Sequence, residues 1–576
     1  MAAPLCTHDD LCAETERLSG LVDRPESRAE CAVALEEMRA LWRKSPTLFS
    51  PEDVARLKAL AERLRATPGP TAEQVLSATF GYTSFRPGQK EVIDALLAGR
   101  DCVAIMPTGA GKSLTYQIPA RMMGGTTLVV SPLIALMKDQ VDALDQVGIR
   151  ATFLNSSVDF EERRRRIEDL RRGRYEIVYA APEGIEASVG FLLSQLSLKL
   201  IAVDEAHCIS HWGHDFRPAY RNLTNLKARF SVPVLALTAT ATAAVCQDIV
   251  TQLGMQDPLS HRGSFFRRNL HLHAYKKGDG GRGTVRDSLY KLVRARKGDS
   301  GIIYCLSRNA TEQTAAFLRE HGVDARAYHA GMESRARTEA QDAFINDDID
   351  VMVATVAFGM GIDKKNIRYI IHRDMPRSIE GYYQEIGRAG RDGVDSDCVL
   401  FYSWADVIAY DRFADDAEDP VFAQAQKDQV REMFSFADRA SCRHRALVGH
   451  FGEKMGACAA CDRCLRSDVL AAARSRKKTV KDSSPTALAV QRHGDSSALF
   501  LRLKDWRKQL AAERRLPAYM IFSDFSLLEM AQKRPRNQSE LLSISGVGQK
   551  KLADYGAQIL AVIQSGDGGE EMQVHV

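Results

Sequence analysis

The sequence has no apolar run that approaches the roughly 20 residues needed to span a membrane as a helix, so we expect no integral membrane protein. The N-terminal segment lacks the apolar core of a secretion signal, because Asp9, Asp10 and Glu14 interrupt it, and we expect no export. The net charge is small as well, since 78 basic residues oppose 74 acidic ones and leave +4. Any contact with nucleic acid must therefore depend on a local basic surface.

Cysteine is sparse and mostly isolated, with 12 in a chain of 576 residues. Cys102, Cys305 and Cys398 each lie alone in an apolar segment, which favours a reducing compartment over a disulfide framework. The exception is a cluster between residues 442 and 464. A composition of 45% hydrophobic and 26% charged residues is typical of globular proteins, and the length allows several domains of about 100–200 residues each.

The strongest chemical signal is the segment 104–114, which reads Ala-Ile-Met-Pro-Thr-Gly-Ala-Gly-Lys-Ser-Leu. An apolar run, 102–106, predicts a buried strand, and the proline and glycines after it predict a loop that leads into a helix. Backbone N–H groups of such a loop and the positive end of the helix bind phosphates. Met106 stands where the full GxxxxGKS pattern has its first glycine. The expected phosphate site comprises Thr108, Gly109, Gly111, Lys112 on the β- and γ-phosphates, and Ser113 as a ligand of Mg²⁺.

Two blocks of alternating strand and helix patterns predict an α/β fold with two tandem parallel sheets. The first block contains candidate strands at 102–106, 127–131, 177–180, 200–203 and 234–238. The second contains them at 302–305, 325–328, 350–354, 369–372 and 397–401, and the glycine-rich segment 276–283 is the expected linker. Two such sheets in series create a cleft in which one lobe holds a nucleotide that the other senses.

Two acidic residues, Asp204 and Glu205, follow the apolar strand 200–203. Asp204 is the candidate partner of Mg²⁺, and Glu205 is the candidate base that activates water. His207 follows them, and hydroxyls in the segment 238–242 can relay hydrogen bonds to it. A helix N-cap at Asp204 is the alternative interpretation.

Arginines provide the last expected part of the catalytic site. Arg388 and Arg391 occur in the segment 383–392, Tyr-Gln-Glu-Ile-Gly-Arg-Ala-Gly-Arg-Asp, and would share one face of a helix at i, i+3. Such arginines can reach across a cleft to the charge that develops on a γ-phosphate. The alternative is a solvated basic face.

Together these motifs resemble those of superfamily 2 helicases, and three further segments resemble the RecQ family of DNA helicases in particular. The segment 80–89 is similar to that family's adenine-binding motif, which implies that Tyr82 and Arg86 stack on the base and Gln89 bonds its edge. The segment 354–363 resembles a motif that links the DNA and ATP sites, with Asp363 near the ribose. The segment 210–217 resembles the family's aromatic-rich loop, which implies DNA contacts from His211, Trp212, His214, Phe216 and Arg217.

Four cysteines, Cys442, Cys458, Cys461 and Cys464, can supply four thiolates to a tetrahedral Zn²⁺. A redox CxxC pair and an iron–sulfur cluster are the alternatives. The cluster resembles the zinc module of the RecQ family, and four protein ligands would make the site structural. The winged-helix domain that usually follows it in this family is missing, because a short basic stretch occupies 466–494. Its absence puts strong unwinding in doubt.

The C-terminal segment 495–564 resembles the helical HRDC domain, and Lys550 and Lys551 after a Gly-Val-Gly turn are candidate DNA contacts. A protein-docking bundle is the alternative. The expected domains are a helical extension (1–70), two RecA-like domains (71–270 and 271–408), a zinc module (409–466), a basic linker (467–494), an HRDC-like domain (495–566) and a disordered tail (567–576).

The resemblance implies an ATP-dependent DNA helicase that uses ATP, Mg²⁺ and Zn²⁺ and moves 3′ to 5′ on single strands in recombination and repair. The alternatives are a DNA-dependent translocase or annealing factor with weak unwinding, an RNA helicase, and a nucleic-acid-binding scaffold without turnover. Expected partners are single-stranded and forked or tailed DNA, with a single-strand-binding protein and recombination proteins as candidates. We expect a monomer in the bacterial nucleoid, or in the nucleus if the source is eukaryotic.

Overall fold

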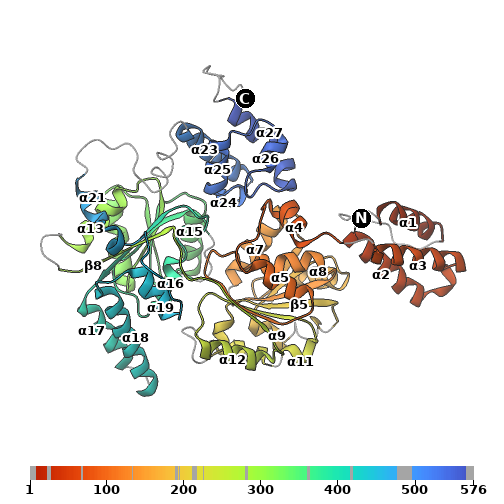
Figure 1. Cartoon of the computed structure of the whole chain (residues 1–576), viewed down its shortest axis with the longest axis horizontal. Helices are drawn as coiled ribbons and strands as arrows, with labels where there is room; N and C mark the ends of the chain where they lie inside the picture. Colours follow the sequence, from red (N-terminus) through yellow and green to blue (C-terminus); the bar gives the residue numbers. More distant parts are fainter. Residues whose placement is uncertain are drawn as a thin grey trace.

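The computed structural model describes residues 8–22, 28–66, 69–132, 134–187, 192–193, 195–210, 217–224, 226–278, 283–359, 364–415, 420–475, 496–514 and 516–565. Two parallel sheets form the centre of the molecule (Figure 1). The expected tail and most of the expected basic linker lie outside the described residues. Within these ranges no helix combines the length and the apolar character needed to cross a lipid bilayer.

The first lobe is built on a seven-stranded parallel sheet in the order β3-β4-β2-β5-β6-β1-β7. Alternate residues of β1 belong to two separate apolar cores, so both faces of the sheet are covered. The strands are β1 Cys102–Ile105, β2 Thr126–Val130, β3 Ala151–Leu154, β4 Ile177–Ala180, β5 Leu198–Val203, β6 Val234–Thr238 and β7 Leu259–Arg262. The helices are α4 Ala72–Val75, η3 Leu76–Phe80, α5 Gln89–Leu97, α6 Leu114–Met122, α7 Ile134–Gln146, α8 Phe160–Arg171, α9 Pro182–Ala187, η4 Ala206–Ile209, η5 Pro218–Leu223, α11 Leu226–Phe230 and α12 Ala243–Leu253.

The second lobe has a six-stranded parallel sheet in the order β10-β11-β9-β12-β13-β8. Its strands are β8 Leu270–Lys276, β9 Ser300–Tyr304, β10 Ala325–Tyr328, β11 Val351–Ala354, β12 Ile367–His372 and β13 Ser396–Tyr402. Its helices are α13 Val285–Arg294, α14 Arg308–Glu320, α15 Ser334–Ile345 and α16 Ile379–Ile386. The two tandem parallel-sheet lobes confirm the expected fold class.

The expected linker at 276–283 was wrong, because β8 already pairs with β13 along residues 270–276. The chain passes from one sheet to the other earlier, in the segment 263–269 between β7 and β8. The sequence pattern does not indicate this strand, because His271 and His273 interrupt its apolar residues. Because only seven residues separate β7 from β8, the two sheets are joined by a short connection.

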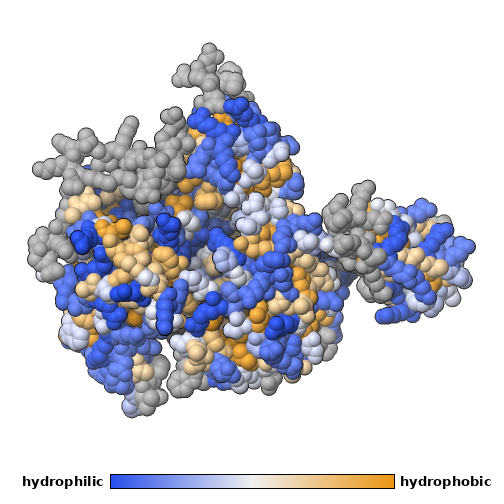
Figure 2. All heavy atoms as spheres, in the orientation of Figure 1, coloured by the Kyte–Doolittle hydropathy of each residue, from blue (hydrophilic) through white to orange (hydrophobic). Residues whose placement is uncertain are grey.

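The N-terminal helices α1 His8–Leu21, α2 Arg28–Lys44, η2 Pro46–Leu48 and α3 Pro51–Ala66 share an apolar core of their own. Ser50 caps α3, since Asp53 N–H donates to its hydroxyl (3.2 Å) and the Asp53 carboxylate accepts from Ser50 N–H (2.9 Å). Figure 1 shows these helices as a unit beside the first lobe, and Figure 2 shows a mixed polar and apolar surface on it. The described residues of this segment are mostly helical, and the extent of the extension stays a prediction.

The metal module extends the second lobe and consists of α17 Trp404–Asp415, α18 Pro420–Asp438, α19 Arg443–His450, α20 Asp462–Leu465 and α21 Val469–Ser475. The segment before α20 contacts strand β8 through its backbone. Leu272 N–H donates to Ala460 C=O (3.1 Å), and Leu272 forms an isolated parallel β-bridge with Cys461. The module is therefore joined to the edge of the second sheet by backbone hydrogen bonds.

The C-terminal helices pack around their own core and contact both lobes (Figure 1). They are α23 Ser496–Arg514, α24 Ala518–Ile521, α25 Asp524–Lys533, α26 Gln538–Leu542 and α27 Gln549–Gln564. On the first lobe, Gly546 N–H donates to Gly81 C=O (3.1 Å), and Tyr555 donates to the Gln146 side chain (3.1 Å).

The contact with the second lobe is a buried network of charges. Arg368 of β12 pairs with Asp392 of its own lobe and, at 3.0 Å, with Asp524 of α25. Asp524 also pairs with Arg507 of α23 at 2.8 Å. Each of these side chains is almost fully buried, so the two arginines and two carboxylates compensate one another's charge.

Candidate active site and metal centre

The phosphate loop connects the end of β1 to the start of α6, as the sequence predicts. Gly109 and Gly111 have φ of +83° and +78°, values that favour glycine. Lys112 Nζ and Thr108 Oγ1 are buried, and neither has a hydrogen-bond partner among the described residues. A buried ammonium without an acceptor is unfavourable, so the loop is suited to an anionic ligand such as a triphosphate.

The two carboxylates follow β5, where Asp204 N–H donates to Val130 C=O (2.9 Å). Burial raises the pKa of Asp204 to about 6, the negative charge of Glu205 raises it too, and the Lys112 ammonium opposes both effects. Glu205 has a left-handed backbone conformation with φ of +48°. Such a conformation is unfavourable for a residue with a side chain and is typical of functional sites. A divalent cation beside these two acids would relieve their repulsion.

His207 connects these acids to the neighbouring strand. Its Nδ1 lies 2.9 Å from Thr238 Oγ1 and 3.4 Å from a carboxylate oxygen of Glu205. Thr238 in turn donates to Thr240 C=O (3.0 Å). The hydrogen-bond relay expected from the segment 238–242 is confirmed.

The two arginines of the second lobe lie beyond the C-terminus of α16, in consecutive turns. The expectation that Arg388 and Arg391 share a helix face was therefore wrong. The helix ends at Ile386, and within the turns that follow Gly390 takes a φ of +53°, where a Cβ would lie 2.4 Å from Asn269 Nδ2. We call residues 387–391 the arginine turn. Arg388 is buried, and its Nη2 lies 2.9 Å from the position of a Cβ at Gly359.

The phosphate loop touches the arginine turn. A Cβ built on Gly387 would lie 2.0 Å from Thr108 Oγ1, so a glycine is needed at that point of contact. The two lobes therefore meet where one carries the loop for phosphates and the other carries arginines. This closeness makes the cleft suitable for a nucleotide that both lobes contact.

The expected adenine-binding residues lie next to the same loop. Gln89 Nε2 donates to Ala110 C=O (3.0 Å) and Gly111 C=O (2.9 Å), and its Oε1 accepts from Arg86 N–H (2.8 Å). The Arg86 guanidinium donates to Gly109 C=O. Tyr82 is 38% exposed. In this structure Gln89 therefore binds the phosphate loop, and its contact with adenine stays a prediction.

Most of the expected DNA-contacting loop lies outside the described residues, including His211, Trp212, His214 and Phe216, as does Asp363. Arg217 is described, and its Nη1 donates to Pro132 C=O (3.3 Å). The two candidate lysines of the C-terminal domain are partly exposed, and both make contacts within the protein. Lys550 donates to Asp145 C=O of α7, and Lys551 Nζ lies 5.2 Å from the Phe522 ring centroid. Burial lowers the pKa of Lys551 to about 7.

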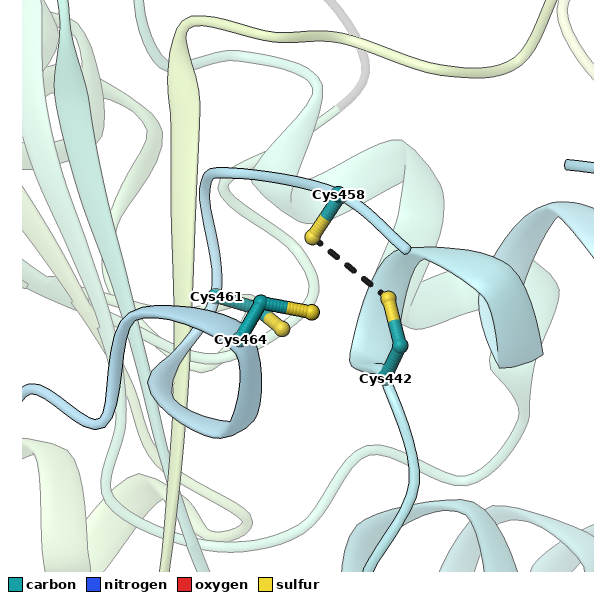
Figure 3. A group of neighbouring side chains, drawn as sticks. All are labelled: Cys442, Cys458, Cys461 and Cys464. Atoms are coloured by element: carbon teal, nitrogen blue, oxygen red, sulfur yellow. Dashed lines mark hydrogen bonds between the residues drawn. The ribbon is translucent and has the colours of Figure 1, made fainter. Parts of the chain in front are cut away.

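The four cysteines of the metal module come together, with their sulfur atoms all within 4.8 Å of one another. Figure 3 shows the four side chains directed into one common space, with Cys442 and Cys458 separated by 3.5 Å. Cys442 caps α19, and its sulfur accepts from Arg445 N–H (3.4 Å). His444 Nδ1 lies 3.1 Å from Cys458 Sγ and can orient that ligand. Four converging thiolates fit Zn²⁺ and leave no open position.

Models of four known families match successive parts of the chain. The DEAD/DEAH box helicase family matches residues 86–249, and the helicase conserved C-terminal domain matches residues 284–393. The RecQ zinc-binding family matches residues 404–465, and the HRDC domain matches residues 496–563.

Curated relatives match over most of their length. The ATP-dependent DNA helicase RecQ of Haemophilus influenzae is 38% identical, over 86% of this chain and 96% of its own. The protein of the same name from Bacillus subtilis is 36% identical, over 86% of this chain and 98% of its own.

Proposed function

Because this chain belongs to the RecQ family, we propose that it is an ATP-dependent DNA helicase that couples hydrolysis of Mg-ATP to movement along single-stranded DNA. The observation that carries this proposal is the buried, unpartnered Lys112 ammonium in a phosphate loop that the arginine turn contacts. Zn²⁺ in the module of four cysteines has a structural role.

Each of the candidate catalytic residues has a role in hydrolysis that its position supports. Lys112 binds the β- and γ-phosphates, and Ser113 and Asp204 hold Mg²⁺, which neutralises phosphate charge when it is bound. Glu205 accepts the proton of the attacking water and is oriented through His207. Arg388 and Arg391 stabilise the charge that develops on the γ-phosphate. Contact of Asp363 with the ribose is proposed from the resemblance of its motif alone.

Movement in the 3′ to 5′ direction on forked or tailed DNA is the finer part of the proposal. We propose that the protein acts as a monomer in the bacterial nucleoid, or in the nucleus if its source is eukaryotic, with a single-strand-binding protein and recombination proteins as partners. The experiment is strand displacement with ATP on two duplexes that differ only in carrying a 3′ or a 5′ single-stranded tail. Displacement of the 3′-tailed duplex alone is expected, and preference for the 5′ tail would refute the direction.

A second candidate function is that of a translocase or annealing factor with weak unwinding. The alignment with the Haemophilus protein is 598 positions long, and 86% of the 576 residues of this chain take part in it, which is about 495 residues. At about 100 positions the Haemophilus protein therefore has a residue where this chain has a gap. Residues 466–495 between the zinc-binding and HRDC matches are too few for a further domain. DNA-stimulated ATP hydrolysis without strand displacement on either tailed duplex would favour this candidate.

The aromatic loop gives a prediction about coupling to DNA. Replacing Trp212 with alanine should leave basal ATP hydrolysis in place and reduce its stimulation by single-stranded DNA about tenfold, since stacking of one base on an aromatic ring contributes about 1–3 kcal/mol. ATPase assays with increasing oligonucleotide measure the effect. Trp42→Ala, in the exposed part of α2, is the matched control and should behave as the wild type. Unchanged stimulation of the Trp212 variant would contradict a role for this loop.

A further inference from the structure

The segment 263–269, which passes from one lobe to the other, carries an arginine that neither the sequence motifs nor the proposed mechanism includes. Arg267 Nη1 donates to Gly387 C=O (2.9 Å) and to Thr108 C=O (3.3 Å). Its Nη2 donates to Gly390 C=O (2.6 Å) and to Ala389 C=O (2.9 Å). One guanidinium thus binds the phosphate loop of the first lobe and the arginine turn of the second.

The environment of this guanidinium is unusual for a partly buried cation. In the part of the chain that the structure describes, no carboxylate lies within ion-pair distance of Arg267, and its partners are peptide carbonyls and the Asn269 amide (3.5 Å). Burial lowers the pKa of Arg267 to about 10, and the positive charges of Arg391 and Arg86 lower it as well. The cation is held by carbonyls at the C-terminal end of α16, where unsatisfied oxygens and the helix dipole favour positive charge.

The backbone of the arginine turn is also held by a side chain other than Arg267. Asn269 Nδ2 already donates to Gly390 C=O (2.9 Å) and to Val394 C=O (3.0 Å), across the end of the turn. What Arg267 adds is the connection to Thr108 in the other lobe. A Cβ on Gly109 would lie 3.4 Å from Arg267 Nη1, so the guanidinium lies directly against the phosphate loop.

We infer that Arg267 is a positioning residue for ATP hydrolysis, which fixes the arginine turn relative to the phosphate loop. This inference rests on the proposed function and assigns the residue that sets the geometry of that site. Because Arg267 binds the carbonyls of residues 387, 389 and 390, its position determines where Arg388 and Arg391 point. A displacement of about 1 Å in such groups can cost about 100-fold in turnover, although substrate still binds.

The role predicts a specific kinetic signature. Lysine at position 267 keeps the positive charge but cannot donate to carbonyls on both lobes from two nitrogen atoms. Arg267→Lys should therefore lower kcat for DNA-stimulated ATP hydrolysis about tenfold or more and change the KM for ATP little. Affinity for ADP should stay within about threefold of wild type, whereas affinity for ADP with aluminium fluoride, which mimics the transferring phosphoryl group, should fall about tenfold.

The experiment compares Arg267→Lys and Arg267→Gln with Arg268→Ala, which removes an exposed positive charge from the neighbouring residue. Thermal unfolding and bound zinc are measured for each variant, and the glutamine variant keeps the test valid if lysine misfolds. Arg268→Ala should match the wild type in kcat and in both affinities. Unchanged kcat together with unchanged affinity for the transition-state analogue would overturn the inference. A loss of thermal stability accompanied by the same fold-loss of affinity for ADP and for the analogue would also overturn it, because that result indicates a structural role alone.

Failure of the proposed function has a different signature. Wild-type protein that hydrolyses no more ATP with single-stranded DNA than without it would reject the helicase assignment before any variant is compared. If the wild type is stimulated and Arg267→Lys is stimulated to the same kcat, only the inference about Arg267 is rejected.

Discussion

Replacing Lys112 with alanine should reduce DNA-stimulated ATP hydrolysis at least about 100-fold, whereas binding to single-stranded DNA should persist. The side-chain ammonium is buried in the phosphate loop without a hydrogen-bond partner among the described residues. Its charge is therefore available to a triphosphate, and removal of one preorganised donor of this kind costs about 10²–10³ in turnover. Steady-state phosphate release and fluorescence anisotropy with a labelled oligonucleotide measure the two properties separately.

The matched control for this substitution is Lys199→Ala, which removes an exposed lysine from β5 of the same lobe. That variant should hydrolyse ATP at the wild-type rate, because its side chain lies far along the strand from the two carboxylates at the C-terminal end. Equal hydrolysis by the Lys112 variant and the wild type would remove the basis for the nucleotide site.

Replacing Cys461 with alanine should release zinc and unfold the metal module. Three thiolates bind Zn²⁺ more weakly than four, and structural zinc contributes about 10–16 kcal/mol of apparent binding free energy in small zinc domains. Cys461 also pairs with Leu272 of β8, so the loss should extend to the edge of the second sheet. The measurements are zinc content of the purified protein and the thermal unfolding temperature.

Cys246→Ala, in α12 and outside the metal cluster, is the control for loss of a thiol and should keep the wild-type zinc content of about one equivalent. Wild-type protein that contains no zinc, or a Cys461 variant that keeps all of it, would contradict the assignment. A brown protein with iron and sulfide would indicate the iron–sulfur alternative instead.

Much of this site could be predicted from the sequence because its functional residues lie in short contiguous motifs, two of them directly after a strand. The phosphate loop, Asp204 and Glu205 follow strands rich in valine, isoleucine and alanine, which are recognised by composition. Strands β3, β7 and β8 were not predicted because they are short or contain polar residues, such as Ser260 and His261 in β7. All three strands lie at the edge of a sheet, and short or partly polar edge strands give a weak periodic signal.

The arrangement around the arginine turn could not be predicted for a different reason. The spacing of Arg388 and Arg391 fits a helix, but α16 already ends at Ile386, and the turns that follow are held by Asn269, whose side chain donates to Gly390 C=O. The position of Arg267 was missed because its partners are main-chain carbonyls, which every residue has. No sequence pattern identifies an arginine that binds backbone from two lobes.

The contacts of the C-terminal helices with both lobes have a mechanical consequence. The seam with the second lobe contains the buried ion pair of Arg368 and Asp524, and separating the two sides would break this pair, although Arg368 keeps Asp392 and Asp524 keeps Arg507. The seam with the first lobe contains hydrogen bonds at Gly81, Asp145 and Gln146 and close backbone packing of Val547 on Gly81. When the cleft widens, the weaker seam should part first, so the C-terminal helices should travel with the second lobe and Lys550 should lose its contact with Asp145.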